Sequence, residues 1–178
     1  MIEIKYNDTV AQALLQRIVD KTSNAEPVLR AIGETVMEIS KQSFETSSSP
    51  DGSPWAKNSD VTILRYLEQQ SGNFKGDGNL SKKGQARQAS KKPLIGQSKD
   101  LSRQFSYEVT ADSVTVSNSM VYAAIQQFGG TRSQFPHLWG DIPARPFMPI
   151  DGTGKLMPLA EAEIVGLMQE YLDEIIEE

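Results

Sequence analysis

A long amphipathic segment near the N-terminus is the feature that most limits how this chain can fold. Glu26-Pro27 begins a helical pattern, with proline in the first turn, where its missing N–H costs no hydrogen bond. Apolar residues then follow at three- and four-residue spacing as far as Phe44, which places them on one face of an α-helix. The Ser-Ser-Ser-Pro run at residues 47–50 favours caps and turns and should end the helix. We therefore expect other elements of the fold to pack against this face.

Shorter alternating patterns predict strands. Apolar and polar residues alternate over residues 105–109 and again over 114–116, and the turn residues 111–113 between them complete a hairpin. Residues 2–6 alternate in the same way and predict a further strand. A first amphipathic helix should follow over residues 8–18, capped by Asp or Thr at its start.

The C-terminal residues 156–176 predict a second long amphipathic helix, on which the charged residues are all acidic. Short helical patterns cover residues 60–69 and 120–128, the latter also readable as a strand, and the proline-rich residues 143–149 should be extended. The predicted strands are neighbours in sequence and do not alternate with crossover helices, which indicates an α+β fold. We expect a small antiparallel sheet packed against the long N-terminal and C-terminal helices.

One stretch departs from these patterns. Residues 70–93 contain almost no apolar side chains, and they hold six Lys or Arg residues against one acidic residue, Asp77. A segment this polar cannot bury enough surface to offset the entropy lost on ordering. We therefore expect residues 1–178 to form a single domain with a mobile basic insertion at about 71–93. Its cations are candidates for weak, non-specific phosphate contact, although a solvated loop is the favoured interpretation. They are Lys82, Lys83, Arg87, Lys91 and Lys92.

Composition argues against several classes of function. The chain has no cysteine, which excludes thiolate nucleophiles and cysteine-ligated metals, and its one histidine, His137, has no acidic neighbours for a metal site. No serine or threonine stands in a recognisable nucleophile setting, and no glycine-rich phosphate loop is present. A net charge of -5 disfavours a dedicated nucleic-acid binder. We expect no catalytic, cofactor-binding or metal-binding residues, with a small carboxylate- and metal-dependent hydrolase as the rival interpretation.

The chain also lacks the signals of a membrane or secreted protein. No apolar run approaches the roughly 20 residues that a membrane-spanning helix needs. The alternating N-terminal residues do not resemble the apolar core of a signal peptide. We therefore expect the protein to stay in the cytoplasm where it is made, with no membrane partner.

Five pieces of sequence follow one another in a distinctive order. They are Phe44 with the Pro-Asp-Gly-Ser-Pro-Trp run of residues 50–55, residues 94–101, the hairpin, residues 122–129, and residues 142–147. In this order and spacing, over residues 28–175, they resemble the phage virion morphogenesis family, which includes the tail completion proteins of Mu-like and P2-like phages.

The resemblance implies a non-enzymatic α+β protein that acts late in tail assembly. Members of the family are placed at the head-proximal end of the tail or at the neck, as homo-oligomeric rings, for which we expect six copies. The implied partners are further copies of the chain, tail tube or sheath proteins, and head–tail connector proteins. The implied location is the host cytoplasm during assembly and then the tail or neck of the virion. A DNA-contacting neck adaptor is the alternative role.

Five residues are candidates for the interface between ring subunits. Trp55 is either an interface anchor or, as we favour, a core aromatic. Arg145, held near prolines, pairs either with a carboxylate across the ring interface or with the acidic C-terminal helix of its own chain, and both remain open. That acidic helix could itself meet the basic stretch of a neighbouring subunit. The five candidates are Trp55, Tyr122, Phe128, Arg145 and Phe147.

Overall fold

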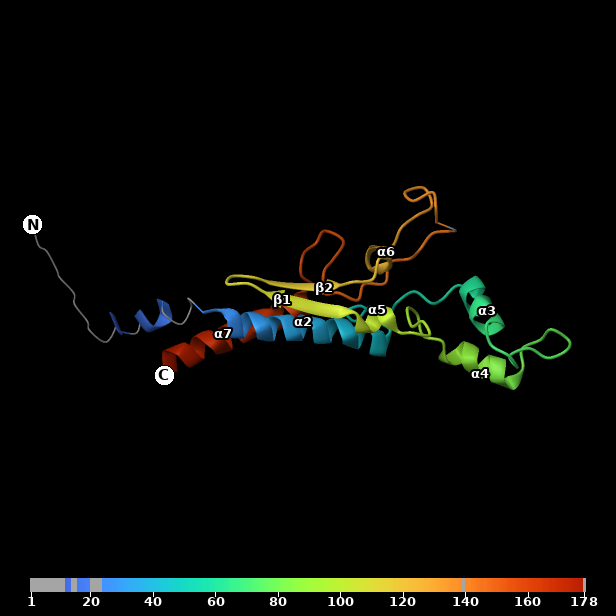
Figure 1. The fold of residues 1–178 in the computed structure, drawn as a ribbon, viewed down its shortest axis with the longest axis horizontal. Coiled ribbons are helices and arrows are strands. Elements are labelled where there is room, and N and C mark those ends of the chain that lie inside the picture. The colour runs from blue at the N-terminus through green and yellow to red at the C-terminus, as the bar shows by residue number, and fades with distance from the viewer. Residues whose placement is uncertain (1–11, 14–15, 20–23, 139, 178) are drawn as a thin grey trace, which may run out of the picture.

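Helix α2 (Glu26–Thr46) lies at the centre of the molecule, and the other long elements run along it (Figure 1). The computed structural model describes residues 12–13, 16–19, 24–138 and 140–177. The predicted strand at residues 2–6 lies outside the described residues, as does most of the predicted first helix, of which residues 12–13 and 16–19 are helical.

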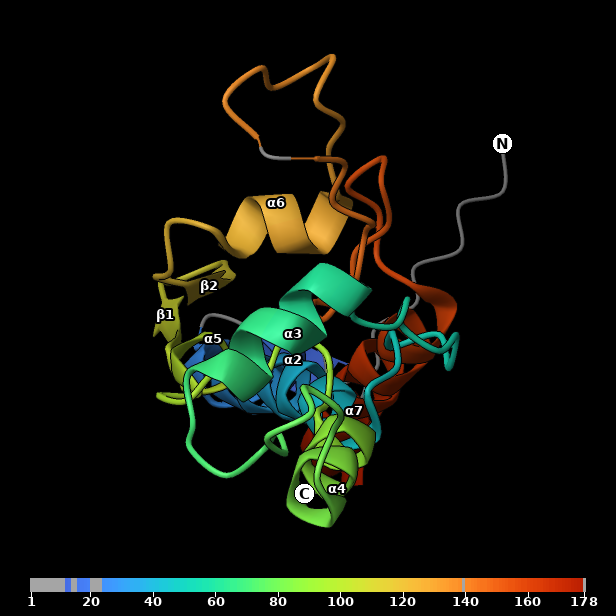
Figure 2. The ribbon, with the colours of Figure 1, turned by 90° about the vertical axis from the view of Figure 1, so that its right-hand side faces the viewer.

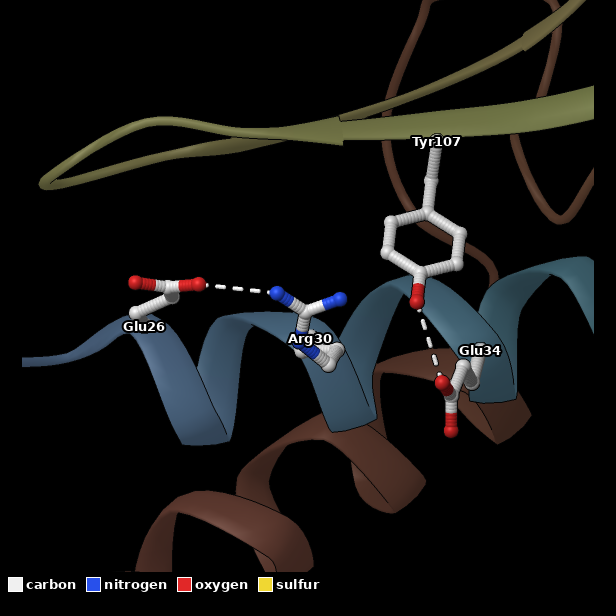
Figure 3. A network of polar contacts seen from close by, with 4 residues as sticks. All are labelled: Glu26, Arg30, Glu34 and Tyr107. Atoms are coloured by element: carbon white, nitrogen blue, oxygen red, sulfur yellow. Dashed lines mark hydrogen bonds and ion pairs between the residues drawn. The ribbon is translucent and has the colours of Figure 1, made fainter.

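The bounds of α2 follow from its end residues. Glu26 lies in the first turn and Pro27 follows it, where proline costs no hydrogen bond. Arg30 donates to the Glu26 carboxylate over 2.8 Å, one helical turn away (Figure 3). The helix ends at Ser47, which adopts a left-handed conformation (φ 57°) and returns its N–H to the Ser43 carbonyl. The predicted stop at residues 47–50 is confirmed.

The hairpin lies on one side of α2. Strands β1 (Phe105–Val109) and β2 (Val114–Asn118) pair antiparallel, with Tyr107 opposite Val116. Gly33 allows the close approach, because a Cβ at this position would lie 2.8 Å from the Tyr107 ring. The Tyr107 hydroxyl lies 3.0 Å from the Glu34 carboxylate and donates to it, which ties the hairpin to α2 (Figure 3).

Helix α7 (Pro158–Glu177) packs along another side of α2 (Figure 1). Its inner side carries Ala160 and Ile175, both fully buried, and the Tyr171 hydroxyl donates to the Asn24 carbonyl over 3.0 Å. The fold is therefore α+β, as the sequence predicts, and both the small antiparallel sheet and the long C-terminal helix pack on α2.

The main hydrophobic core forms where α2 ends. Phe44 lies 5.3 Å from Trp55 and from Phe147 between ring centroids, and 6.2 Å from Phe105. Phe105 and Phe147 in turn lie 5.9 Å apart. Three of these four ring pairs meet edge to face, which is a favourable arrangement for aromatic rings. Leu101, in the short helix α5 (Asp100–Arg103), completes this cluster. Four segments distant in sequence are thus joined through Phe44.

The prediction that residues 70–93 form a loop without secondary structure is wrong. Helix α3 (Asp60–Glu68) packs against a further helix, α4 (Lys82–Ser90), whose N-cap Ser81 accepts from the Gly84 N–H. We call residues 60–90 the arm, which projects beyond the end of α2 (Figure 1) and faces the viewer in Figure 2.

The arm is held together mainly by hydrogen bonds between polar groups, because it has little apolar core. The Asn73 side chain is fully buried, and its amide nitrogen donates to the carbonyls of Leu67 and Gln70 over 2.8 and 3.1 Å. Arg87 donates to the Asn73 side-chain oxygen over 2.9 Å. Gly84 lets α4 approach, because a Cβ there would lie 2.2 Å from the Asn73 carbonyl oxygen. Composition alone does not indicate this buried amide, which is why the sequence-based expectation failed.

Replacing Phe44 with alanine should lower the free energy of unfolding by about 3–5 kcal/mol, because it removes the ring that three other aromatic rings contact. Urea unfolding followed by circular dichroism measures this loss. Val121→Ala is the control, since that side chain is 98% exposed and its loss should change stability by no more than about 0.5 kcal/mol. Equal losses in the two variants would contradict the central role of Phe44.

Candidate functional site

Three separate stretches meet at Phe147, which is fully buried. They are residues 47–57, helix α6 (Ala123–Phe128) and the extended residues 143–150. The extended segment belongs to no strand, so several of its backbone groups need side-chain partners. Trp55 and Gln127 supply such partners, whereas the Arg145 side chain ties the segment to the carbonyls of Ala56 and Lys57.

Trp55 reaches the extended segment from the turn that follows α2. Its indole Nε1 donates to the Pro146 carbonyl over 2.7 Å, and the backbone N–H of Trp55 donates to the Ser47 carbonyl over 3.0 Å. The turn itself is closed by Asp51, whose side chain accepts from the Ser53 N–H, and this hydrogen bond lowers the pKa of the Asp51 carboxyl. Trp55 is therefore a core residue, in agreement with the favoured interpretation of the sequence.

Arg145 joins the same two stretches in the opposite direction. Its Nε donates to the Ala56 carbonyl over 2.8 Å, and its Nη2 donates to the Lys57 carbonyl over 2.9 Å. The side chain is almost fully buried, and this desolvation lowers the pKa of its guanidinium. The pairing proposed between Arg145 and the C-terminal helix of its own chain is wrong, because the planar fork is used on two backbone oxygens at the base of the arm, and the pairing across a ring interface stays a prediction.

Gln127 fastens α6 to the extended segment with four hydrogen bonds. Its side-chain oxygen accepts from the N–H groups of Phe147 and Met148 over 2.9 and 3.0 Å. Its side-chain nitrogen donates to the carbonyls of Met148 and Ile150 over 3.0 and 3.2 Å. Sequence reasoning missed this residue. The available signal was a glutamine on the inward face of a short helix, one position before Phe128.

Of the five predicted interface residues, three lie inside the chain. Trp55, Arg145 and Phe147 are buried among residues of their own chain, and this burial removes them from a surface that a second protein could contact. Tyr122 and Phe128 remain on the surface, with exposures of 40% and 51%. The structure thus leaves the two ends of α6 as the exposed part of the predicted interface.

The outer side of α6 carries an apolar surface. Val121, Tyr122, Phe128 and Phe135 are all exposed there, and we call these four residues the α6 surface. Beside them is an open hollow of about 610 Å³, which is also lined by Ile125, Leu138 and Ile142. The backbone on this side is tightly joined: Gly130 and Ile142 exchange two hydrogen bonds, and a Cβ at Gly129 would lie 2.7 Å from the Ala144 nitrogen.

The five predicted phosphate contacts divide into two groups. Arg87 binds Asn73, Lys91 donates to the Ile95 carbonyl, and Lys92 donates to the Glu45 carbonyl at the C-terminal end of α2. Burial also lowers the pKa of Lys91, whose ammonium lies 4.8 Å from the centre of the Tyr66 ring. Lys82 and Lys83 are exposed on α4 and are the members of the predicted set that face solvent.

The part of the chain that the structure describes holds no group of three or more histidine or acidic side chains arranged to bind a metal ion. None of its helices is long and apolar enough to cross a membrane.

Comparisons with known proteins all identify proteins of phages or prophages. The model of the phage virion morphogenesis family matches residues 6–173. A Mu-like prophage protein of Haemophilus influenzae, "FluMu G protein 2", is 27% identical over 177 residues and covers 99% of both chains. The "Putative capsid assembly protein G" of Escherichia phage Mu is 28% identical over 127 residues, which are 71% of this chain and 69% of the relative. No solved structure matches the chain.

Gln127→Glu should lower the free energy of unfolding at pH 7 by about 3 kcal/mol or more, because a buried carboxylate cannot donate to the carbonyls of Met148 and Ile150. Burial should raise the pKa of the new carboxyl above the value of about 4.3 that it has in the unfolded chain. The loss should therefore be largest above the raised pKa and should shrink as the pH falls towards about 4.3.

Urea unfolding at a series of pH values, each compared with the wild-type chain, tests this expectation. Gln126→Glu is the control, because the neighbouring side chain is partly exposed and its substitution should cost little at any of these pH values. A loss in Gln127→Glu that does not change with pH would contradict the burial of the carboxyl.

Proposed function

Because the chain belongs to the phage virion morphogenesis family, we propose that it completes or terminates the tail at its head-proximal end, as a homo-oligomeric ring without catalytic activity. A structural or assembly role in making the virion follows from the family itself. The position in the particle, the ring and the absence of catalysis are the parts that we propose.

The α6 surface is the observation that carries the proposal. Fourteen large hydrophobic side chains are exposed in the described part of the chain, whereas ten hydrophobic residues are buried, so much apolar surface remains uncovered. Contiguous exposed apolar patches mark sites of protein contact in soluble proteins. A protein that other virion parts must cover fits this distribution better than an enzyme, whose apolar residues would line an enclosed pocket.

The hydrogen bonds that hold α6 in place support the same proposal. Gln127 fixes the inner side of the helix by four hydrogen bonds, and the Arg145 N–H donates to the Gln126 carbonyl over 2.8 Å. Tyr122 and Phe128 therefore project from a rigid support. A preorganised surface of this kind loses little conformational entropy on binding, which favours a stable contact. We assign the α6 surface to neighbouring proteins at the tail end, either tail tube or sheath proteins or head–tail connector proteins.

A head-side role is the second candidate. The phage Mu relative carries the name "Putative capsid assembly protein G", which refers to the head and not to the tail. A neck adaptor that touches DNA would be a related role, with Lys82 and Lys83 as phosphate contacts. In either case the protein would act in the host cytoplasm during assembly and then remain in the virion.

Particles assembled without this protein separate these roles by electron microscopy. We expect headless tails of uncontrolled length, because a missing terminator leaves the end of the tail open to further addition. Tails of normal length that fail to join full heads would instead indicate a joining role. Aberrant or missing heads would contradict the tail proposal and favour capsid assembly.

A surface variant tests the assigned contact. Tyr122→Asp combined with Phe128→Ser should abolish incorporation into particles, because it places a charge and a polar group where a partner would bury apolar rings. Asp is well tolerated at residue 122 in the isolated chain, since Tyr122 is the N-cap of α6. Complementation in phage lacking the wild-type gene, followed by counting the copies in purified particles, gives the readout.

Leu156→Ser is the matched control for this variant, because Leu156 is also exposed but lies outside the α6 surface. It should be incorporated normally. Both proteins should keep the thermal unfolding midpoint within a few degrees of the wild type. Normal incorporation of the double variant would overturn the assignment of the α6 surface.

A further inference from the structure

We propose that copies of this chain join head to tail, with the arm of one copy docked on the outer side of α7 of the next. The inference rests on the proposed ring. It adds the two surfaces that make contact and the direction in which one copy follows the next. It is carried by an uncovered apolar stripe on α7, a hollow on the acidic face of the same helix, and a complementary surface at the other end of the molecule.

Helix α7 has two apolar sides, of which α2 covers one. Ile164, Leu167, Tyr171 and Ile175 recur at three- and four-residue spacing and are buried or half-buried. A second apolar stripe follows the same spacing and is exposed on the described structure. An amphipathic helix with a single partner needs only one apolar side, so the second indicates a second partner. The stripe consists of Val165, Met168, Leu172 and Ile176.

A hollow lies on a different face of α7 from this stripe, the face that carries the acidic residues. It has a volume of about 220 Å³ and is lined by Ala162, Gly166, Leu167 and two carboxylates, Glu163 and Glu170. The hollow exists because alanine and glycine leave no bulk there, and a Cβ at Gly166 would meet no atom within 4 Å. Neither Glu163 nor Glu170 has a hydrogen-bond or ion-pair partner in the described part of the chain. The shape suits a long side chain with an apolar stem and a cationic end.

The arm has the complementary properties. The arm, residues 60–90, holds five basic and three acidic residues, whereas α7 holds six acidic residues and no basic one. Lys75, Lys82 and Lys83 are exposed on the arm, and the exposed apolar residues Val61 and Leu64 lie on α3 of the same unit. Opposite charge beside matching apolar surface gives both orientation and affinity to a protein contact.

The two surfaces cannot meet within one chain. The arm lies at one end of the long axis of the molecule, and α7 lies towards the other end (Figure 1). Their contact must therefore join two copies. Such a contact uses different surfaces on the two partners, and repeating it produces either a closed ring or an open filament.

Two variants of the full chain test the junction. The arm variant is Lys75→Gln with Lys82→Gln and Lys83→Gln, and the helix variant is Glu163→Gln with Glu170→Gln. Neutral substitutions avoid creating a new attraction between the two variants. Sedimentation velocity should show self-association at least tenfold weaker for each variant alone. Lys99→Gln with Arg103→Gln and Lys155→Gln, and Glu38→Gln with Glu108→Gln, remove the same numbers of exposed charges elsewhere and should associate as the wild type does.

Mixing the two variants gives the decisive result. The intact α7 of the arm variant can still receive the intact arm of the helix variant, so the mixture should form one-to-one pairs that do not grow further. Native mass spectrometry with nitrogen-15 in one variant identifies these mixed pairs. Association of both variants at the wild-type level would overturn the junction while leaving a ring made through other surfaces intact.

Other outcomes would also overturn it. An arm variant that associates normally but loses salt-sensitive binding to duplex DNA would assign the arm to DNA. A helix variant that lowers the thermal unfolding midpoint without weakening association would show that α7 is covered within its own chain. Loss of association in both variants without mixed pairs would show that the arm and α7 do not bind each other. A wild-type chain that stays monomeric at every concentration, in solution and on tail tubes, would overturn the ring proposal as well.

Discussion

The position of Phe147 beneath Phe44 is the contact on which the non-helical half of the molecule depends. The residues around Phe147 are extended but belong to no sheet, so the usual ladder of backbone hydrogen bonds is missing. A buried backbone group without a partner costs free energy comparable to a lost hydrogen bond, and the segment could not stay buried without substitutes. Trp55 and Gln127 provide them, and the Arg145 side chain ties the segment to the carbonyls of Ala56 and Lys57. The same few residues therefore provide both the apolar packing and the hydrogen-bond partners of the buried backbone groups.

This arrangement links the interior to both exposed surfaces. Gln127 sets the position of α6, and Arg145 holds the carbonyls of Ala56 and Lys57, from which the arm begins. A change at the buried junction would consequently move the α6 surface and the arm together. The sequence pieces that carry the family resemblance are largely the pieces that meet here. Their order in the chain reflects one spatial junction and not a set of independent surface motifs.

The parts of the fold that could be predicted from sequence are those in which side-chain spacing decides the structure. The face of α2, the hairpin and α7 were all readable because apolar residues recur at the helical or strand period. Gln127 was missed and Arg145 was misread, because their partners are backbone atoms far away in the chain, which no local pattern records. The arm was missed for a related reason: a single buried amide, Asn73, replaces the apolar residues that sequence analysis looks for.

The construction of the arm has a consequence for how the molecule opens. Its order depends on the hydrogen bonds of Asn73, one close glycine contact and the side chain of Leu67, with few other apolar residues buried. Regions with little buried apolar surface unfold locally at a lower free energy than the global transition. The amide protons of α4 should therefore exchange with solvent through openings that leave α2 and the hairpin closed. We expect the arm to behave as a separate cooperative unit, which loosens and refolds while the rest of the chain stays native.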